Sequence, residues 1–221
     1  MIDRFRDDSS GRLPGRRLGV HAAVLAIILA SALPEVILWG ADTGLWGSVR
    51  WRLIAYEYGA FWGGLLANWQ PNYRLQPLAM FFSYGFLHAG PVHFTVNMIT
   101  LLSLAPPIIA RVGARRLVLL YALSLPGGAA VFAALGPVAA PMVGASGALF
   151  GLAGGYLGWE WSDRRAARRP LWPVLRVLAL LAALNLVLWW AMSGALAWQT
   201  HLGGFVAGWA MATGPWRRRR G

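Results

Sequence analysis

The feature that most constrains this chain is a pair of long stretches that contain no charged residue. One covers residues 117–159 and the other residues 177–216. At a helical rise of about 1.5 Å per residue, each stretch is far longer than the ~30 Å hydrocarbon core of a bilayer, so each is expected to cross it twice. Hydrophobic residues make up 57% of the chain and charged residues only 13%, which excludes a water-soluble domain of this size.

Proline and glycine indicate where these stretches turn. Gly136-Pro137 through Gly144 interrupts the first, and Ser193-Gly194 interrupts the second. Two single apolar runs, 18–39 and 90–110, come earlier in the chain and are each long enough to cross once. The first run is too long for a signal-peptide core, so we expect it to be retained. The sequence therefore predicts an all-α integral membrane protein with a six-transmembrane-helix bundle.

The arginines predict how this bundle is oriented. The chain has no lysine and its formal net charge is +12. Four basic segments, 1–17, 111–116, 164–176 and 217–221, fall on one side of a six-helix chain, whereas only Arg50, Arg52 and Arg74 fall on the other. The positive-inside rule then puts both termini in the cytoplasm. We expect a basic tail 1–17, a membrane domain 18–216 and a basic tail 217–221, in a bacterial inner (cell) membrane and with no nucleic-acid partner.

A long loop, residues 40–87, is predicted between the first two helices on the extracytoplasmic side. It is rich in aromatic residues, namely Trp46, Trp51, Tyr56, Tyr58, Phe61, Trp62, Trp69 and Tyr73. Amphipathic aromatic side chains favour the headgroup level, so the loop is expected to be partly embedded in the outer leaflet. Two explanations stay open: the aromatics anchor the loop at the interface, or the loop shapes the access of a substrate.

Polar residues inside hydrocarbon are costly, so they mark candidate sites. His93 and Asn97 are four residues apart and share one face of the second helix. Ser146 opens the fourth helix between Gly144 and Gly147. Both groups also have a purely structural explanation, because His and Asn can hydrogen-bond neighbouring helices and a glycine-flanked serine can allow close helix packing.

A third group, His201 with Gly204 and Gly208, lies near the start of the sixth helix. These glycines form a small-residue face that could pack against the glycines of the fourth helix and bring His201 beside Ser146. The second, fourth and sixth helices all begin on the extracytoplasmic side. The three groups are therefore expected at similar depth, although the topology was inferred without them.

A serine beside a histidine base, with donors placed for an oxyanion, is a nucleophilic acyl-transfer site. The fourth helix is expected to be short, 146–159, which would place Ser146 below the outer surface. The predicted substrate is therefore a membrane-embedded peptide. Because the chain has no cysteine, thiol nucleophiles and disulfides are excluded.

These motifs resemble those of the rhomboid family of intramembrane serine proteases. The resemblance covers about residues 87–208 and includes His-x4-His-x3-Asn, Gly-x-Ser-x-Gly-x-x-Phe and His-x-x-Gly-x3-Gly, in that order. It implies a catalytic dyad of Ser146 and His201, and oxyanion donors from His93, Asn97 and the Ser146 backbone N–H. The supporting residues that it implies are His88, for the embedded loop, Phe150, packed on His201, and the glycines Gly144, Gly147, Gly204 and Gly208.

The chain departs from the family pattern in one place. Rhomboids often carry a Trp-Arg pair shortly before the first histidine, where this chain reads Leu78-Ala79-Met80-Phe81. A Trp51-Arg52 pair exists, but it lies far upstream of His88.

The resemblance implies an endopeptidase that cleaves transmembrane segments of membrane proteins near the extracytoplasmic face through an acyl-enzyme. Its expected partners are transmembrane protein substrates and the lipid bilayer, with no cofactor and no metal. Two alternatives stay open. One is a metal site formed by His88, His93 and His201, and the other is a non-catalytic rhomboid-like protein that binds transmembrane segments.

Overall fold

The computed structural model describes residues 15–214. The regular secondary structure of this part of the chain is helical, apart from an isolated bridge between Phe61 and Met142. The predicted tails 1–17 and 217–221 lie wholly or almost wholly outside these residues. The helices are α1 (Gly15–Asp42), α2 (Trp51–Gly59), α3 (Gln76–Ser83), α4 (Pro91–Val112), α5 (Ala114–Leu135), α6 (Ser146–Ala166), α7 (Trp172–Ala191) and α8 (Trp198–Thr213), with short 3-10 turns η1 (Gly63–Leu66) and η2 (Tyr84–Phe86).

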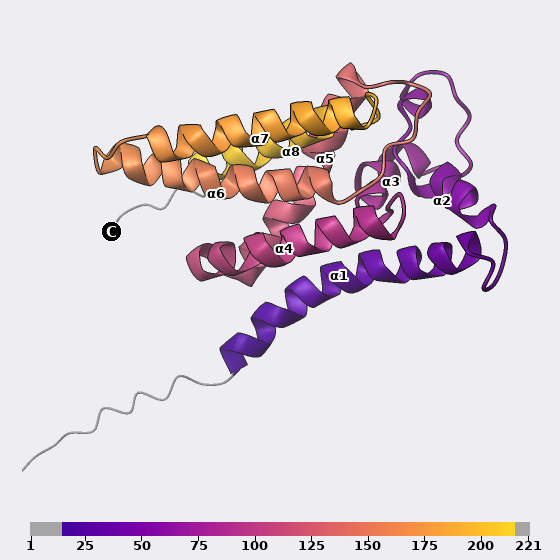
Figure 1. Cartoon of the computed structure of the whole chain (residues 1–221), viewed down its shortest axis with the longest axis horizontal. Helices are drawn as coiled ribbons and strands as arrows, with labels where there is room; N and C mark the ends of the chain where they lie inside the picture. The colour runs from indigo at the N-terminus through magenta and orange to yellow at the C-terminus, as the bar shows by residue number, and fades with distance from the viewer. Residues whose placement is uncertain (1–14, 215–221) are drawn as a thin grey trace, which may run out of the picture.

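The long helices run side by side, and the short helices α2 and α3 gather at one end of the bundle (Figure 1). Helix α6 packs against both α5 and α8, and α5 also packs against α8. Helix α1 lies on the outer side of α4, and α7 touches the rest of the bundle little, with Val174 its only buried residue. The three-helix group α5–α6–α8 is therefore the core to which the other helices are added.

Four helices are long and apolar enough to cross a membrane: α1 from Ala22 onward, α4, α5 and α7. Helix α8 has only 16 residues, and α6 is rich in glycine and carries charged residues in its last two turns. Both are largely enclosed by other helices, so their side chains meet protein more than lipid and need not be strongly apolar. The fold is thus that of an all-helical membrane protein, whereas hydropathy alone does not establish six crossings.

The chain turns where proline and glycine predict it. Helix α5 ends at Leu135 and α6 begins at Ser146, while α7 ends at Ala191 and α8 begins at Trp198. The predicted short fourth helix is wrong, because α6 has 21 residues and continues to Ala166. Charged residues such as Glu160 and Arg164 end the apolar part of the helix but are good helix formers, so the helix itself continues through them.

Residues 40–87, predicted as a long loop, contain regular structure. Helices α2 and α3 and the turns η1 and η2 all fall within this segment. Its aromatic side chains are in part buried, because Phe61 and Tyr84 are fully enclosed and join the main core. Phe61 packs edge-on against Phe81 and Phe132, so the segment is attached to α5 through an aromatic cluster.

Candidate functional site

Ser146 is the first residue of α6, directly after a turn that requires glycine. Gly144 has a φ of +122°, a conformation that residues with a side chain rarely adopt, and its N–H donates to the Tyr84 carbonyl at 2.9 Å. A Cβ on Gly144 would come within 2.6 Å of the His93 ring. The turn therefore brings the segment before Ser146 against His93 at the start of α4.

His201 lies in the first turn of α8, and glycines determine how closely this helix approaches α6. A Cβ on Gly204 would overlap the Gly147 carbonyl, and a Cβ on Gly208 would overlap the Gly151 carbonyl. Backbone against backbone contact of this kind is possible only without side chains. The two glycine faces thus pack directly on each other and bring the first turns of α6 and α8 together.

This packing puts the Ser146 hydroxyl in hydrogen-bond contact with His201. The distance from Ser146 Oγ to His201 Nε2 is 2.8 Å. The His201 ring is 7% exposed and stacks on Phe150, with centroids 4.2 Å apart and planes 6° from parallel. Phe150 lies one turn after Ser146 on the same face of α6, so the imidazole is held between an aromatic plate and the serine.

The other nitrogen of His201 meets a residue that the sequence analysis missed. Asn185, on α7, has its Oδ1 2.6 Å from His201 Nδ1. The signal was present in the sequence, because Asn185 is the only polar residue between Arg176 and Ser193. Polar residues at such depth are rare unless they have a partner.

His93 and Asn97 lie one helical turn apart near the start of α4. His93 Nδ1 accepts a hydrogen bond from the Ala89 N–H at 3.2 Å. Asn97 is 4% exposed and donates one amide hydrogen to the His93 carbonyl at 3.0 Å, which leaves its second hydrogen. His93 faces Gly144 two residues before Ser146, whereas Asn97 and Ser146 form no hydrogen bond with each other among the described residues.

An apolar cavity of about 570 Å³ lies between α7 and α8 beside this site. Phe150, Asn185 and His201 all line it, together with leucine and tryptophan side chains of α7 and α8. Within residues 15–214, no three His, Asp or Glu side chains are grouped as metal ligands would be, so the alternative of a His88–His93–His201 metal site has no geometric support.

Comparison with known proteins identifies the family. The family model for the Rhomboid domain matches residues 75–218, which is more than half of the chain. The chain belongs to the rhomboid family. One relative is RHOMBOID-like protein 4 of Arabidopsis thaliana, which is 34% identical over 131 residues, covering 57% of this chain and 31% of the relative. The chain thus spans about a third of the length of that curated relative, which is a plant protein.

A rhomboid domain together with the apolar helices makes this chain an integral membrane protein. The matched region begins at Leu75 and therefore includes all three polar groups but not α1 or α2. Helix α2 carries the Trp51-Arg52 pair, whereas the stretch Leu78-Ala79-Met80-Phe81, where rhomboids often carry such a pair, falls in α3 within the matched region.

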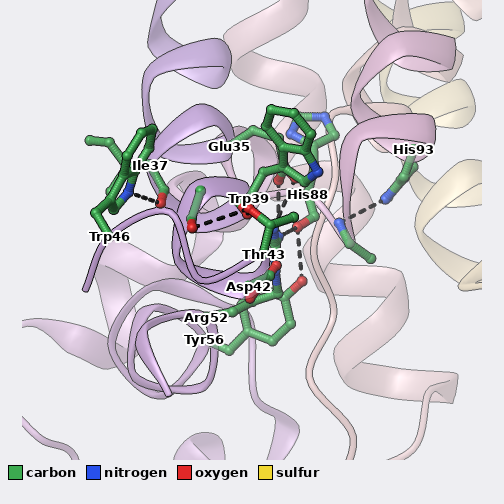
Figure 2. A network of polar contacts seen from close by, with 12 residues as sticks. Glu35, Ile37, Trp39, Asp42, Thr43, Trp46, Arg52, Tyr56, His88 and His93 are labelled. Atoms are coloured by element: carbon green, nitrogen blue, oxygen red, sulfur yellow. Dashed lines mark hydrogen bonds and ion pairs between the residues drawn. The ribbon is translucent and has the colours of Figure 1, made fainter. Parts of the chain in front are cut away.

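Arg52, in α2, contacts the segment that holds His88, the first histidine of the family motif (Figure 2). Its Nη1 donates to the His88 carbonyl at 2.6 Å, although the two residues are 36 positions apart. The Tyr56 hydroxyl donates to the same carbonyl at 2.8 Å. Arg52 of the Trp51-Arg52 pair is therefore distant from His88 in the sequence but adjacent to it in space, at the end of the bundle where α4 begins.

Two carboxylates of α1 hold the Arg52 guanidinium in place. Glu35 accepts from both terminal nitrogens at 2.9 and 3.0 Å, and Asp42 accepts from Nε at 2.6 Å. Partial burial opposes the charge of Arg52, but hydrogen bonds to Glu35, Asp42 and Tyr56 outweigh it, so the pKa of the guanidinium is raised. Arg52, as a permanent cation, thus ties α1 and α2 to His88, three residues before α4 begins.

His88 has a fully enclosed ring, with neither ring nitrogen hydrogen-bonded in the structure. It packs edge-on against His93 and Phe94, with centroids 5.2 and 5.5 Å away. Burial, and then the neighbouring His93, lower the pKa of His88 to about 3, so the ring is neutral at physiological pH. A neutral His88 can lie near the Arg52 cation without repulsion.

Proposed function

We propose that this rhomboid protein is an intramembrane serine endopeptidase in which Ser146 is the nucleophile and His201 the general base and acid. The observation that carries the proposal is the 2.8 Å separation of Ser146 Oγ and His201 Nε2. A serine hydroxyl is a weak nucleophile at neutral pH unless a base takes its proton. A serine needed only for helix packing would not require a histidine at this distance.

In the proposed reaction, His201 Nε2 takes the Ser146 proton as Oγ attacks the carbonyl carbon of the scissile peptide. The tetrahedral intermediate collapses when the C–N bond breaks and the imidazolium returns its proton to the leaving amine. The acyl group then remains on Ser146. A water molecule, deprotonated by the same imidazole, hydrolyses this ester and regenerates the hydroxyl.

Three donors are proposed to stabilise the oxyanion. Ser146 is the first residue of α6, where backbone N–H groups have no acceptor within the helix. The His93 ring lies against Gly144, and Asn97 retains an amide hydrogen one turn below. In a neutral His93 that accepts at Nδ1 from the Ala89 N–H, the proton is on Nε2, which leaves this nitrogen as a donor.

We further propose six crossings, with α6 and α8 as the two additional ones beside the four apolar helices. Their packing against α5 and against each other compensates for low hydropathy. With both termini cytoplasmic, Ser146 would lie near the extracytoplasmic face and cleave transmembrane segments there. The substrate helix must unwind before attack, because its peptide groups are otherwise hydrogen-bonded. A location in a bacterial inner membrane stays a prediction.

A second candidate function is the binding of transmembrane segments without cleavage. The apolar cavity of about 570 Å³ beside His201 favours it, because such a cavity can accept apolar side chains without any reaction.

A fluorophosphonate probe separates the two functions. We expect it to label the detergent-solubilised protein once, at Ser146, because only an activated serine attacks phosphorus at a useful rate. Labelling should disappear in Ser146→Ala, fall at least about 100-fold in His201→Ala and be unaffected by a chelator. The matched control is Ser162→Ala, which removes a serine from the other end of the same helix.

The same proteins should be incubated in liposomes with a panel of transmembrane segments. Cleavage by the wild type that is lost in Ser146→Ala supports the protease. Folded wild-type protein that neither reacts with the probe nor cuts any segment, but retains segments on a column, would instead establish the binding function.

A further inference from the structure

Helix α7 presents a single polar side chain to the bundle, and that side chain reaches the histidine of the candidate site. Val174, Leu178, Leu181 and Asn185 recur at spacings of three and four, and these are residues of α7 that are at least partly buried. They therefore form the inward face of the helix. Asn185 is the polar member of this face, and its Oδ1 lies 2.6 Å from His201 Nδ1.

The orientation of the Asn185 amide is determined by a second contact. Its Nδ2 donates to the Leu181 carbonyl one turn earlier, at 3.0 Å. Reversing the amide would put its oxygen against that carbonyl and its NH₂ against the imidazole, so the recorded orientation is the one that satisfies both ends. Oδ1 is consequently the group that faces His201, and as an acceptor it requires a hydrogen on Nδ1.

That hydrogen determines which form of the histidine is present. A neutral imidazole with its proton on Nδ1 has its lone pair on Nε2, the nitrogen 2.8 Å from Ser146 Oγ. This is the only neutral form that can take the serine proton. The alternative form, protonated at Nε2, would donate toward the serine and could not act as a base.

We propose that Asn185 is a positioning residue that completes a Ser146–His201–Asn185 triad. It fixes the tautomer and ring plane of His201, and its carbonyl dipole stabilises the imidazolium that forms during attack. A neutral amide is suited to this apolar cavity, because a carboxylate there would carry a large desolvation cost. The inference rests on the proposed serine protease function and adds a member to its machinery.

A purely structural role predicts different behaviour. Apart from Asn185, helix α7 contacts the rest of the bundle through apolar side chains and borders an apolar cavity, so leucine at position 185 would suit packing at least as well as asparagine. If Asn185 serves only packing, Asn185→Leu should therefore leave the rate unchanged. If it positions His201, the reaction should slow although the fold is intact.

The test compares Asn185→Leu, Asn185→Ala and Asn185→Asp with wild type in cleavage and in fluorophosphonate labelling. We expect Asn185→Leu and Asn185→Ala to lower kcat and the labelling rate about 10- to 100-fold, because the base loses one hydrogen bond in the chemical step. KM should change less than about twofold, because this bond does not contact the substrate. Asn185→Asp retains an acceptor and should recover at least part of the rate. Leu184→Ala, on the exposed face one residue earlier, is the matched control.

A measurement independent of activity covers the case in which a variant fails to fold. In ¹⁵N-histidine-labelled wild-type protein, with the His201 signal assigned by its loss in His201→Gln, the spectrum should show a protonated Nδ1 and an unprotonated Nε2. In folded Asn185→Leu, a mixture of both tautomers should appear. A wild-type His201 protonated at Nε2, or a rate in folded Asn185→Leu equal to that of active wild type, would overturn the triad. Absence of wild-type labelling and cleavage would instead count against the protease itself.

Discussion

At the residue scale, Arg52 shows how a charged side chain can be retained in an otherwise apolar protein. Its side chain is 14% exposed and that of Glu35 is 3% exposed, so both side chains are largely removed from water. Bidentate geometry and the additional bonds to Asp42 and the His88 carbonyl satisfy every nitrogen of the guanidinium. Such a group is costly to break from one side, because the remaining charge stays buried.

Replacing Arg52 with glutamine should therefore destabilise the protein by about 3–5 kcal/mol, because Glu35 loses its counter-charge. Thermal unfolding in detergent would measure the change. The double variant Arg52→Gln with Glu35→Gln should recover part of the loss, since Asp42, the carboxylate that then lacks a partner, is one-third exposed to solvent. Arg50→Gln, two residues away and exposed, is the control and should differ from wild type by less than about 0.5 kcal/mol. Equal stability of Arg52→Gln and Arg50→Gln would show that the network contributes nothing.

At the scale of elements, the approach of α6 to α8 depends on glycine rather than on hydrophobic side chains. Association of helices in lipid gains little from apolar burial, because lipid tails are as apolar as leucine. Close van der Waals packing must therefore hold the two helices together. The contacts of Gly204 with Gly147 and of Gly208 with Gly151 provide it, because they bring backbone onto backbone. The contact between Ser146 and His201 follows from this packing, since each lies in the first turn of its helix.

Gly204→Val should separate α6 from α8, because its side chain would overlap the Gly147 carbonyl. We expect a loss of about 1–3 kcal/mol of stability and at least a tenfold fall in fluorophosphonate labelling. Ala210→Val adds similar bulk to an exposed position of the same helix and should change neither. Wild-type labelling in Gly204→Val would mean that the two helices adapt and that their glycines do not control the distance.

At the scale of the whole molecule, the arrangement of helices agrees with the distribution of charge. Helix α1 begins, and α8 ends, at the end of the bundle opposite to α2 and α3 (Figure 1). An ion pair between Arg111 and Asp163, at 2.5 Å, and a contact of Arg111 with the Trp159 ring join α4 to α6 near that same end. Charges are thus concentrated where headgroups and water are expected.

The proposed topology predicts that positions 50, 74 and 139 face outward and that positions 115 and 168 face the cytoplasm. Single cysteines at these exposed positions, in a chain without native cysteine, can be probed in intact cells with a membrane-impermeant thiol reagent. Arg50→Cys, Arg74→Cys and Ala139→Cys should react, and Arg115→Cys and Arg168→Cys should react only after the cells are broken. Reaction of Arg168→Cys in intact cells would refute the six-crossing orientation.

The sequence by itself determined the helical membrane class, the turns and the candidate residues Ser146, His201, His93 and Asn97. These follow from local properties: charge and proline end an apolar run wherever they occur, and residues four apart share a helix face in any fold. The tertiary structure decided the rest. Arg52 reaches the His88 carbonyl across 36 positions, and Asn185 meets His201 because α7 lies beside α8. Such contacts depend on how helices pack, which no single segment specifies, and the true length of α6 shows that the end of an apolar run need not be the end of a helix.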